Sequence, residues 1–116
     1  MVKVIMGLKG SGKTKQLIEL VHKALDVENG SVICIEKDRK LTYDIPSGAR
    51  LVSASDYSFG SPEFLKGFIS GLYSGNYDIT HIFIDGLYKV THFAGDVQAV
   101  EELLDLLDAF GERNGI

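Results

Sequence analysis

The 116-residue sequence contains one cysteine, no apolar run long enough to span a bilayer and no excess of positive charge. Because Cys34 is alone, an intrachain disulfide is excluded, and its place in the apolar run 32–35 predicts a buried structural thiol. The apolar runs are much shorter than the roughly 20 residues of a transmembrane helix. From Met1 the chain directly enters a short apolar run, which leaves no room for a signal peptide. We therefore expect a cytoplasmic protein with no membrane partner.

The formal net charge is −4, and it is unevenly distributed. Lysine and arginine outnumber the acidic residues over residues 1–50, whereas acidic residues dominate residues 51–116. The chain has neither a long basic stripe nor basic residues interleaved with aromatic ones, so we do not expect it to bind a nucleic-acid backbone. A small anionic ligand held by the basic first half fits this distribution better. With 45% hydrophobic residues, the chain suits one compact domain over residues 1–116.

The most specific feature is residues 7–14, which read Gly-Leu-Lys-Gly-Ser-Gly-Lys-Thr. This stretch matches the phosphate-binding pattern Gly-x-x-x-x-Gly-Lys-Ser/Thr, and it lies between an apolar run and an amphipathic helical pattern. Glycines allow the tight turn that points successive N–H groups inward, and the helix start adds a partial positive charge. We expect Lys13 to reach the β- and γ-phosphates of a nucleotide and the Thr14 hydroxyl to bind Mg²⁺. The residues expected to hold the phosphates are Gly7, Lys9, Gly10, Ser11, Gly12, Lys13 and Thr14.

Strand and helix patterns alternate along the chain, which indicates an α/β fold with a mostly parallel sheet. Apolar, β-branched runs predict four strands, at residues 2–6, 31–35, 51–54 and 80–85. Apolar residues at helical spacing predict three helices, one from Lys13 to a left-handed stop at Asn29-Gly30, one over 62–75 after the N-cap Ser61, and one from the cap Asp96 to a stop at Gly111.

Two of the predicted strands end in an acidic residue, Glu36 after 31–35 and Asp85 at the end of 80–85. In open α/β sheets, ligands bind beyond the carboxyl ends of the strands. An apolar strand that ends in aspartate downstream of a phosphate loop is typical of the Walker B element, whose carboxylate holds Mg²⁺. We therefore expect Thr14 and Asp85 to bind the metal ion.

These residues resemble the P-loop NTPase superfamily and, within it, the core of the RecA-like recombinases and related ATPases. Gly7 to Thr14 would be the Walker A motif, and Asp85 would end Walker B. The resemblance implies a three-layer α/β/α sandwich around a mostly parallel sheet, ATP and Mg²⁺ as ligands, and Glu36 as the base that polarises the attacking water. One departure is Gly86, which stands where many related ATPases have a glutamate and argues against fast hydrolysis.

The RecA-like arrangement also calls for another strand after Ile116, between the phosphate-loop strand and the Walker B strand. Because the sequence stops there, we expect either a truncated chain or a sheet whose exposed apolar edge pairs with a second copy of the chain.

The leading functional hypothesis is Mg²⁺-dependent ATP binding with slow hydrolysis, in which Lys13, Glu36 and Asp85 are the catalytic residues. Basic residues that could complete the site are Arg39, Lys40 and Lys89, or an arginine from a partner. A small-molecule or nucleotide kinase is the alternative enzyme. A nucleotide-responsive regulatory module is the alternative without catalysis.

Overall fold

The computed structural model describes residues 12–27, 30–37, 44–57, 61–86 and 97–116, of which Val97 and Ala99 are described by their backbone alone. The elements are, in chain order, α1 (Lys13–Val27), β1 (Ser31–Glu36), β2 (Ala49–Ser53), the 3₁₀ turn η1 (Ala54–Asp56), α2 (Pro62–Gly75), β3 (Ile79–Ile84) and α4 (Val97–Asn114). The predicted strand at residues 2–6 lies outside the described residues. The described elements confirm the predicted α/β class.

The three strands form one parallel sheet in the order β2-β1-β3. Cys34 in the middle of β1 is in register with Leu51 of β2 and Phe83 of β3. Because β1 has a strand on either side and helices over both faces, its residues from Val32 to Glu36 are all buried. Among the described residues, β2 and β3 each pair with β1 alone. The predicted pairing of a sheet edge with a second chain remains a prediction.

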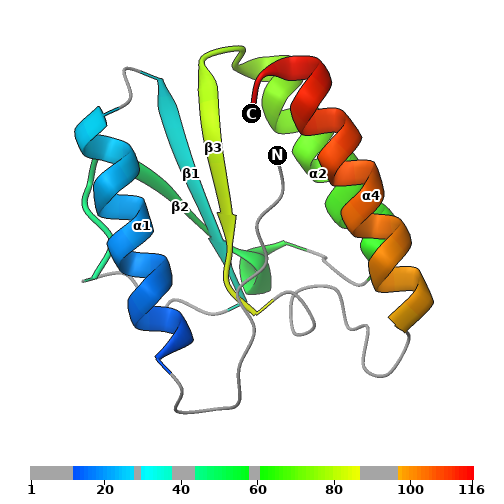
Figure 1. Cartoon of the computed structure of the whole chain (residues 1–116), viewed down its shortest axis with the longest axis horizontal. Coiled ribbons are helices and arrows are strands. Elements are labelled where there is room, and N and C mark those ends of the chain that lie inside the picture. Colours follow the sequence, from blue (N-terminus) through cyan, green and yellow to red (C-terminus); the bar gives the residue numbers. More distant parts are fainter. Residues whose placement is uncertain (1–11, 28–29, 38–43, 58–60, 87–96) are drawn as a thin grey trace.

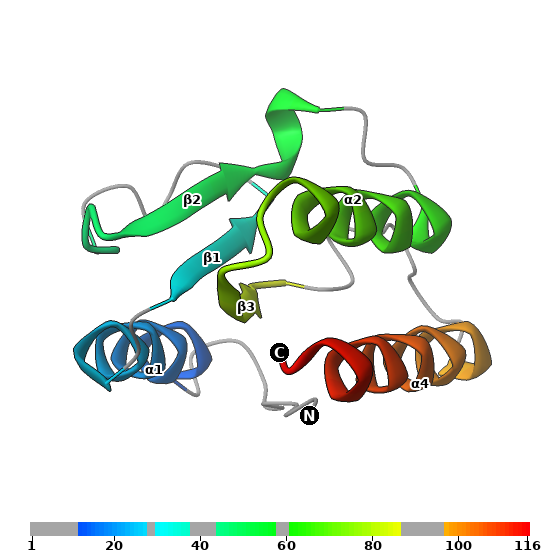
Figure 2. The same cartoon turned by 90° about the horizontal axis from the view of Figure 1, so that it is seen from above.

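Helices cover both faces of the sheet, with α1 on one face and α2 and α4 side by side on the other (Figure 1, Figure 2). The apolar stripe of α1 packs on alternate residues of the strands, and the buried core of this face is Leu17, Val21, Ala24, Val32, Cys34, Ile45 and Ala49. The other strand residues face α2 and α4, and the buried core of that face is Ile33, Ile35, Val52, Ala54, Leu65, Ile69, Ile79 and Leu103. The sheet therefore lies between two helical layers.

Gly30 lies between α1 and β1 and does not have the positive φ of a left-handed stop, so that role is wrong for Gly30, whereas Asn29 lies outside the described residues. A different constraint applies to this residue. A Cβ at position 30 would collide with the side chain of Thr80 and with the carbonyl oxygen of Asp78. The N–H of Ser31 donates a hydrogen bond to the same Asp78 oxygen, at 2.8 Å. The missing side chain therefore lets the backbone before β1 lie directly against the start of β3.

The start of α2 follows the sequence prediction. Ser61 is the N-cap residue, its hydroxyl accepts a hydrogen bond from the N–H of Phe64 at 3.1 Å, and Pro62 is the first helical residue. Proline is well suited to this position because the first N–H groups of a helix have no intrahelical acceptor.

The end of α4 differs from the prediction, because the helix continues through the buried Gly111 to Asn114. Gly115 has the left-handed φ of +73°, and the N–H of Ile116 donates to the carbonyl oxygen of Gly111 at 2.9 Å. This hydrogen bond is that of a Schellman motif. Gly115 is thus the glycine that ends the helix, and the prediction that Gly111 does so is wrong.

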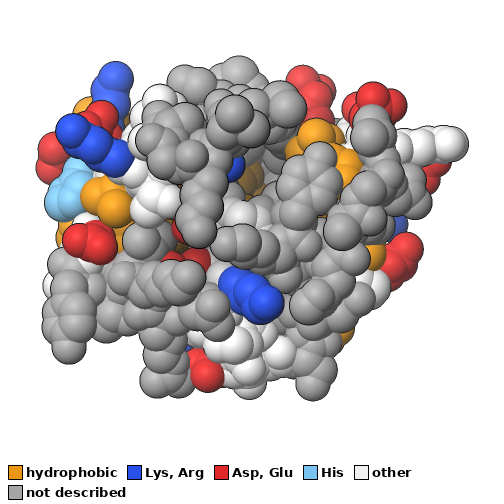
Figure 3. Space-filling view, turned by 90° about the horizontal axis from the view of Figure 1, so that it is seen from below, with side chains coloured by type: hydrophobic (Ala, Val, Ile, Leu, Met, Phe, Trp, Pro, Cys, Tyr) orange, Lys and Arg blue, Asp and Glu red, His pale blue; other side chains and the backbone are white. Residues whose placement is uncertain are grey.

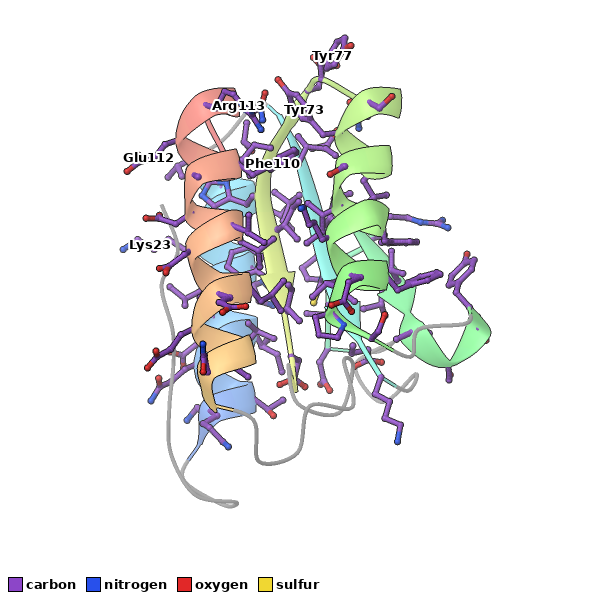
Figure 4. All side chains as sticks on the ribbon, turned by 90° about the vertical axis from the view of Figure 1, so that its right-hand side faces the viewer. Lys23, Tyr73, Tyr77, Phe110, Glu112 and Arg113 are labelled. Atoms are coloured by element: carbon purple, nitrogen blue, oxygen red, sulfur yellow. The ribbon has the colours of Figure 1, made fainter. Side chains whose placement is uncertain are left out.

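An aromatic cluster joins α2 to α4 near the edge at which the strands begin (Figure 4). The ring of Tyr73 lies 5.8 Å from that of Phe110, at an interplanar angle of 84°, and 5.1 Å from that of Tyr77. Such edge-to-face pairs are favoured by the charge distribution of aromatic rings. The cluster fixes the ends of α2 and α4 that lie away from the carboxyl ends of the strands.

Candidate functional site

The three strands end at one edge of the sheet, and α1, α2 and α4 all begin near that edge (Figure 1). Lys13 is the first residue of α1, Glu36 is the last residue of β1, and Asp85 directly follows β3. The fold therefore brings all three predicted catalytic residues to the same edge, where ligands bind in open α/β sheets.

Glu36 and Asp85 end neighbouring strands. Ile35 is in register with Ile84, and the N–H of Asp85 donates a hydrogen bond to the carbonyl oxygen of Ile35 at 2.8 Å. Residues that are in register lie on the same face of a sheet, and side chains alternate along each strand. Ile35 and Ile84 face α2 and α4, so the next residues, Glu36 and Asp85, both lie on the opposite face, which α1 covers. Glu36 is 3% exposed and Asp85 is half-buried.

Cys34 lies next to this pair of carboxylates, further from the edge of the sheet at which the strands end. It precedes Glu36 by two residues, shares its face of the sheet and is fully buried. Burial and, to a smaller extent, the negative charges of Glu36 and Asp85 raise the pKa of the Cys34 thiol to about 12. The thiol is therefore protonated at neutral pH, and the prediction of a buried thiol is confirmed.

Of the phosphate-loop residues, the structure describes Gly12, Lys13 and Thr14, whereas Gly7, Lys9, Gly10 and Ser11 lie outside the described residues. Gly12 has a φ of +86°, a conformation that favours glycine, and its carbonyl oxygen accepts the N–H of Gln16 at 3.0 Å. Gly12 thus ends the loop and starts the helix. Lys13 is half-buried and Thr14 is exposed.

The first turn of α1 has N–H groups without intrahelical acceptors, and the helix dipole adds a partial positive charge at this end. Lys13 adds a full positive charge to the same turn. The candidate site therefore combines a positive helix start with two carboxylates at the ends of strands. The further basic candidates Arg39, Lys40 and Lys89 lie outside the described residues.

Ser53 and Ser55 are two residues of this edge to which the sequence interpretation gave no role. The Ser53 hydroxyl donates to the carbonyl oxygen of Lys37 at 3.3 Å and lies 2.9 Å from the Ser55 hydroxyl. The N–H of Ser55 donates to the same Lys37 oxygen at 2.8 Å. The available signal was a pair of serines directly after an apolar run, at the carboxyl end of a predicted strand.

Gly86 also has a left-handed backbone, with a φ of +70°. A side chain at this position would be strained, which explains in backbone terms why the chain carries glycine after Asp85. The carboxylates that the described part of this edge provides on β1 and β3 are those of Glu36 and Asp85.

Seen from the edge at which the strands end, basic and acidic side chains of the described residues both reach the surface (Figure 3). A hollow of about 440 Å³ lies elsewhere, between the beginnings of the strands and the end of α2, and its lining includes Ser31, Arg50 and Asn76. Because this hollow is at the opposite end of β1 from Glu36, it is separate from the candidate site.

The described residues contain neither a membrane-spanning helix nor a cluster of metal-binding side chains. No helix there has the length and apolarity needed to cross a membrane. Nor does the described part of the chain gather three or more histidine, cysteine or acidic side chains in a group that could hold a metal ion. A scan against protein-family models and searches of curated proteins and of solved structures found no match to the chain.

Proposed function

We propose that the protein binds ATP with Mg²⁺ at the edge of the sheet where the strands end, and hydrolyses it slowly. One observation carries this proposal: Lys13 begins α1 at the same edge at which Glu36 and Asp85 end neighbouring strands. The phosphate-loop pattern of residues 7–14 supplies the ligand class.

The residues at this edge suit a magnesium nucleotide. Mg²⁺ prefers oxygen ligands, and Thr14 and Asp85 offer a hydroxyl and a carboxylate. Bound Mg²⁺ would neutralise part of the charge on the β- and γ-phosphates. Lys13 and the N–H groups of the first turn of α1 would hold the phosphate oxygens from the protein side.

In the hydrolysis that we propose, a water oxygen forms a bond to the γ-phosphorus, and the bond from that phosphorus to the β–γ bridging oxygen breaks. ADP leaves with the bonding electron pair, and the Glu36 carboxylate accepts the proton of the water. Because Glu36 is almost fully buried, its position depends on the strand that carries it. Gly86 offers no additional carboxylate, so we expect turnover to be slow.

The binding proposal is tested by calorimetric titration of ATP, with and without Mg²⁺, into wild-type protein and Lys13→Ala. A hydrogen bond to a charged group contributes about 1.5–3 kcal/mol, so Lys13→Ala should weaken ATP binding about tenfold to a hundredfold. Lys15→Ala is the matched control, because it removes the same charge from an exposed position on α1. Equal affinities of wild type and Lys13→Ala would refute the site.

The hydrolysis proposal is tested separately by measuring phosphate release from wild type, Glu36→Gln and Asp85→Asn. Loss of turnover in Glu36→Gln with retained ATP affinity would support its role as the base. The left-handed Gly86, which has no carboxylate at the position directly after Asp85, favours the regulatory module as second candidate. ATP binding without measurable phosphate release would support that candidate.

A further inference from the structure

The carbonyl oxygens of the residues on either side of Glu36 both accept hydrogen bonds from residues at or just after the ends of the neighbouring strands. On one side, the carbonyl oxygen of Ile35 accepts the N–H of Asp85 at 2.8 Å. On the other side, the carbonyl oxygen of Lys37 accepts the N–H of Ser55 at 2.8 Å and the hydroxyl of Ser53 at 3.3 Å. The backbone of Glu36 is therefore fixed from β3 and from the end of β2 together.

The direction of the hydroxyl bonds follows from the number of protons. The Ser53 hydroxyl has one proton, which it donates to the Lys37 carbonyl oxygen. When Ser53 donates to Lys37, Ser55 is the donor and Ser53 the acceptor in the 2.9 Å contact between the two hydroxyls. The resulting chain of hydrogen bonds runs from Ser55 through Ser53 to the residue after Glu36.

Packing alone does not account for a serine at position 53. The side chain is 6% exposed, and the other buried residues of β2, Ala49 and Val52, are apolar. Burial of a hydroxyl is unfavourable unless it forms hydrogen bonds. Ser53 is in register with Glu36 and lies on the same face of the sheet. Its hydroxyl therefore has a role in hydrogen bonding to the backbone just after β1.

We propose that Ser53 is a positioning residue for Glu36, an inference that rests on the proposed ATP hydrolysis. By holding the Lys37 carbonyl, Ser53 fixes the backbone that directs the Glu36 side chain. The proposed role of Ser53 requires no contact with the nucleotide or with the water. It acts on turnover through Glu36, because a misplaced base slows the reaction even when binding is unchanged.

The test measures kcat, KM and ATP affinity for Ser53→Ala, Glu36→Gln and the double variant. Ser53→Ala should lower kcat about fivefold to tenfold, as expected for the loss of one neutral hydrogen bond that acts in the transition state, and leave KM within about twofold. In the Glu36→Gln background, Ser53→Ala should cause no further loss of kcat. Ser53→Thr, which keeps the hydroxyl, should restore kcat.

An equal loss of kcat from Ser53→Ala in both backgrounds would overturn the inference, because Ser53 would then act independently of Glu36. An unchanged kcat in folded Ser53→Ala would also overturn it. If Ser53→Ala does not fold, Ser53→Cys, which has nearly the same size and a much weaker donor, replaces it in the same cycle.

The failure of this inference is distinguishable from the failure of the proposed function. Suppose that Lys13→Ala weakens ATP binding and Glu36→Gln lowers turnover, but Ser53→Ala has no effect. This result would overturn only the role of Ser53. Absence of ATP binding, or of turnover, in the wild type would overturn the inference together with the proposed reaction.

Discussion

The buried thiol of Cys34 makes the stability of the protein depend on pH in the alkaline range. The pKa of the thiol is 9.0 without a protein environment and about 12 in the folded protein. Between these values the unfolded chain loses the thiol proton while the folded chain keeps it. Below about pH 9 the thiol is protonated in both states and does not change the free energy of unfolding. As the pH rises from there toward about 12, the free energy of unfolding falls.

The size of this effect follows from the linkage relation. One pKa unit corresponds to about 1.4 kcal/mol, so the thiol should lower the free energy of unfolding by about 1.4 kcal/mol between pH 8 and pH 10. The measurement is urea unfolding at pH 8, 9 and 10, in EDTA, for wild type and Cys34→Ala. Lysine and tyrosine titrations are common to both proteins and cancel in the comparison.

Cys34→Ala also leaves a small cavity, which lowers stability equally at every pH, so the comparison concerns the change with pH. Wild type should lose about 1.4 kcal/mol more than the variant over this range. Because pH 8 to 10 lies below the folded pKa of about 12, this extra loss is set almost entirely by the unfolded pKa of 9.0. An identical pH dependence of wild type and Cys34→Ala would refute the reasoning.

Two predictions concern glycines. Gly30→Ala should lower the free energy of unfolding by about 1–3 kcal/mol, because the added Cβ would collide with Thr80 and with the Asp78 carbonyl. Gly48→Ala, where a Cβ would lie 3.4 Å from a Leu25 methyl group, is its control and should be nearly neutral. Gly71→Ala, with no heavy atom within 4 Å of the added Cβ in the middle of α2, should raise stability by about 0.5–1 kcal/mol. Thermal and urea unfolding measure all three changes, and a destabilised Gly71→Ala or a neutral Gly30→Ala would contradict these contacts.

Local patterns were sufficient for most of the described elements. The residues of α2 and its cap were predicted correctly because Ser61 and Pro62 determine a helix start without help from distant residues. Glu36 and Asp85 were placed at strand ends because apolar runs stop at them.

Tertiary contacts decided the features that the sequence interpretation missed. Gly111 resembles a helix stop, but its burial within α4 and the bond from Ile116 to its carbonyl leave the left-handed role to Gly115. Gly30 was interpreted as part of a helix stop. The actual reason for a glycine there is not visible locally, because the collision that a side chain would cause involves residues about fifty positions away.

The hydroxyls of Ser53 and Ser55 were missed for a similar reason. The Ser53 hydroxyl and the Ser55 N–H both donate to the carbonyl oxygen of Lys37, which follows another strand, so no local pattern indicates these bonds. The adjacency of Glu36 and Asp85 is likewise a property of the strand order, which hydrophobic periodicity does not specify.

The strand order also has a consequence for the sequence of events during folding. β2 and α2 separate β1 from β3 along the chain, so the pairing of β1 with β3 closes a long loop. Long-range parallel pairing is slow because the entropy of loop closure is lost before the contacts form. A chain that has reached only α2 contains Glu36 without Asp85 beside it. A ligand that needs both carboxylates would therefore bind the completed sheet and no earlier species, and its binding would report the final step of assembly.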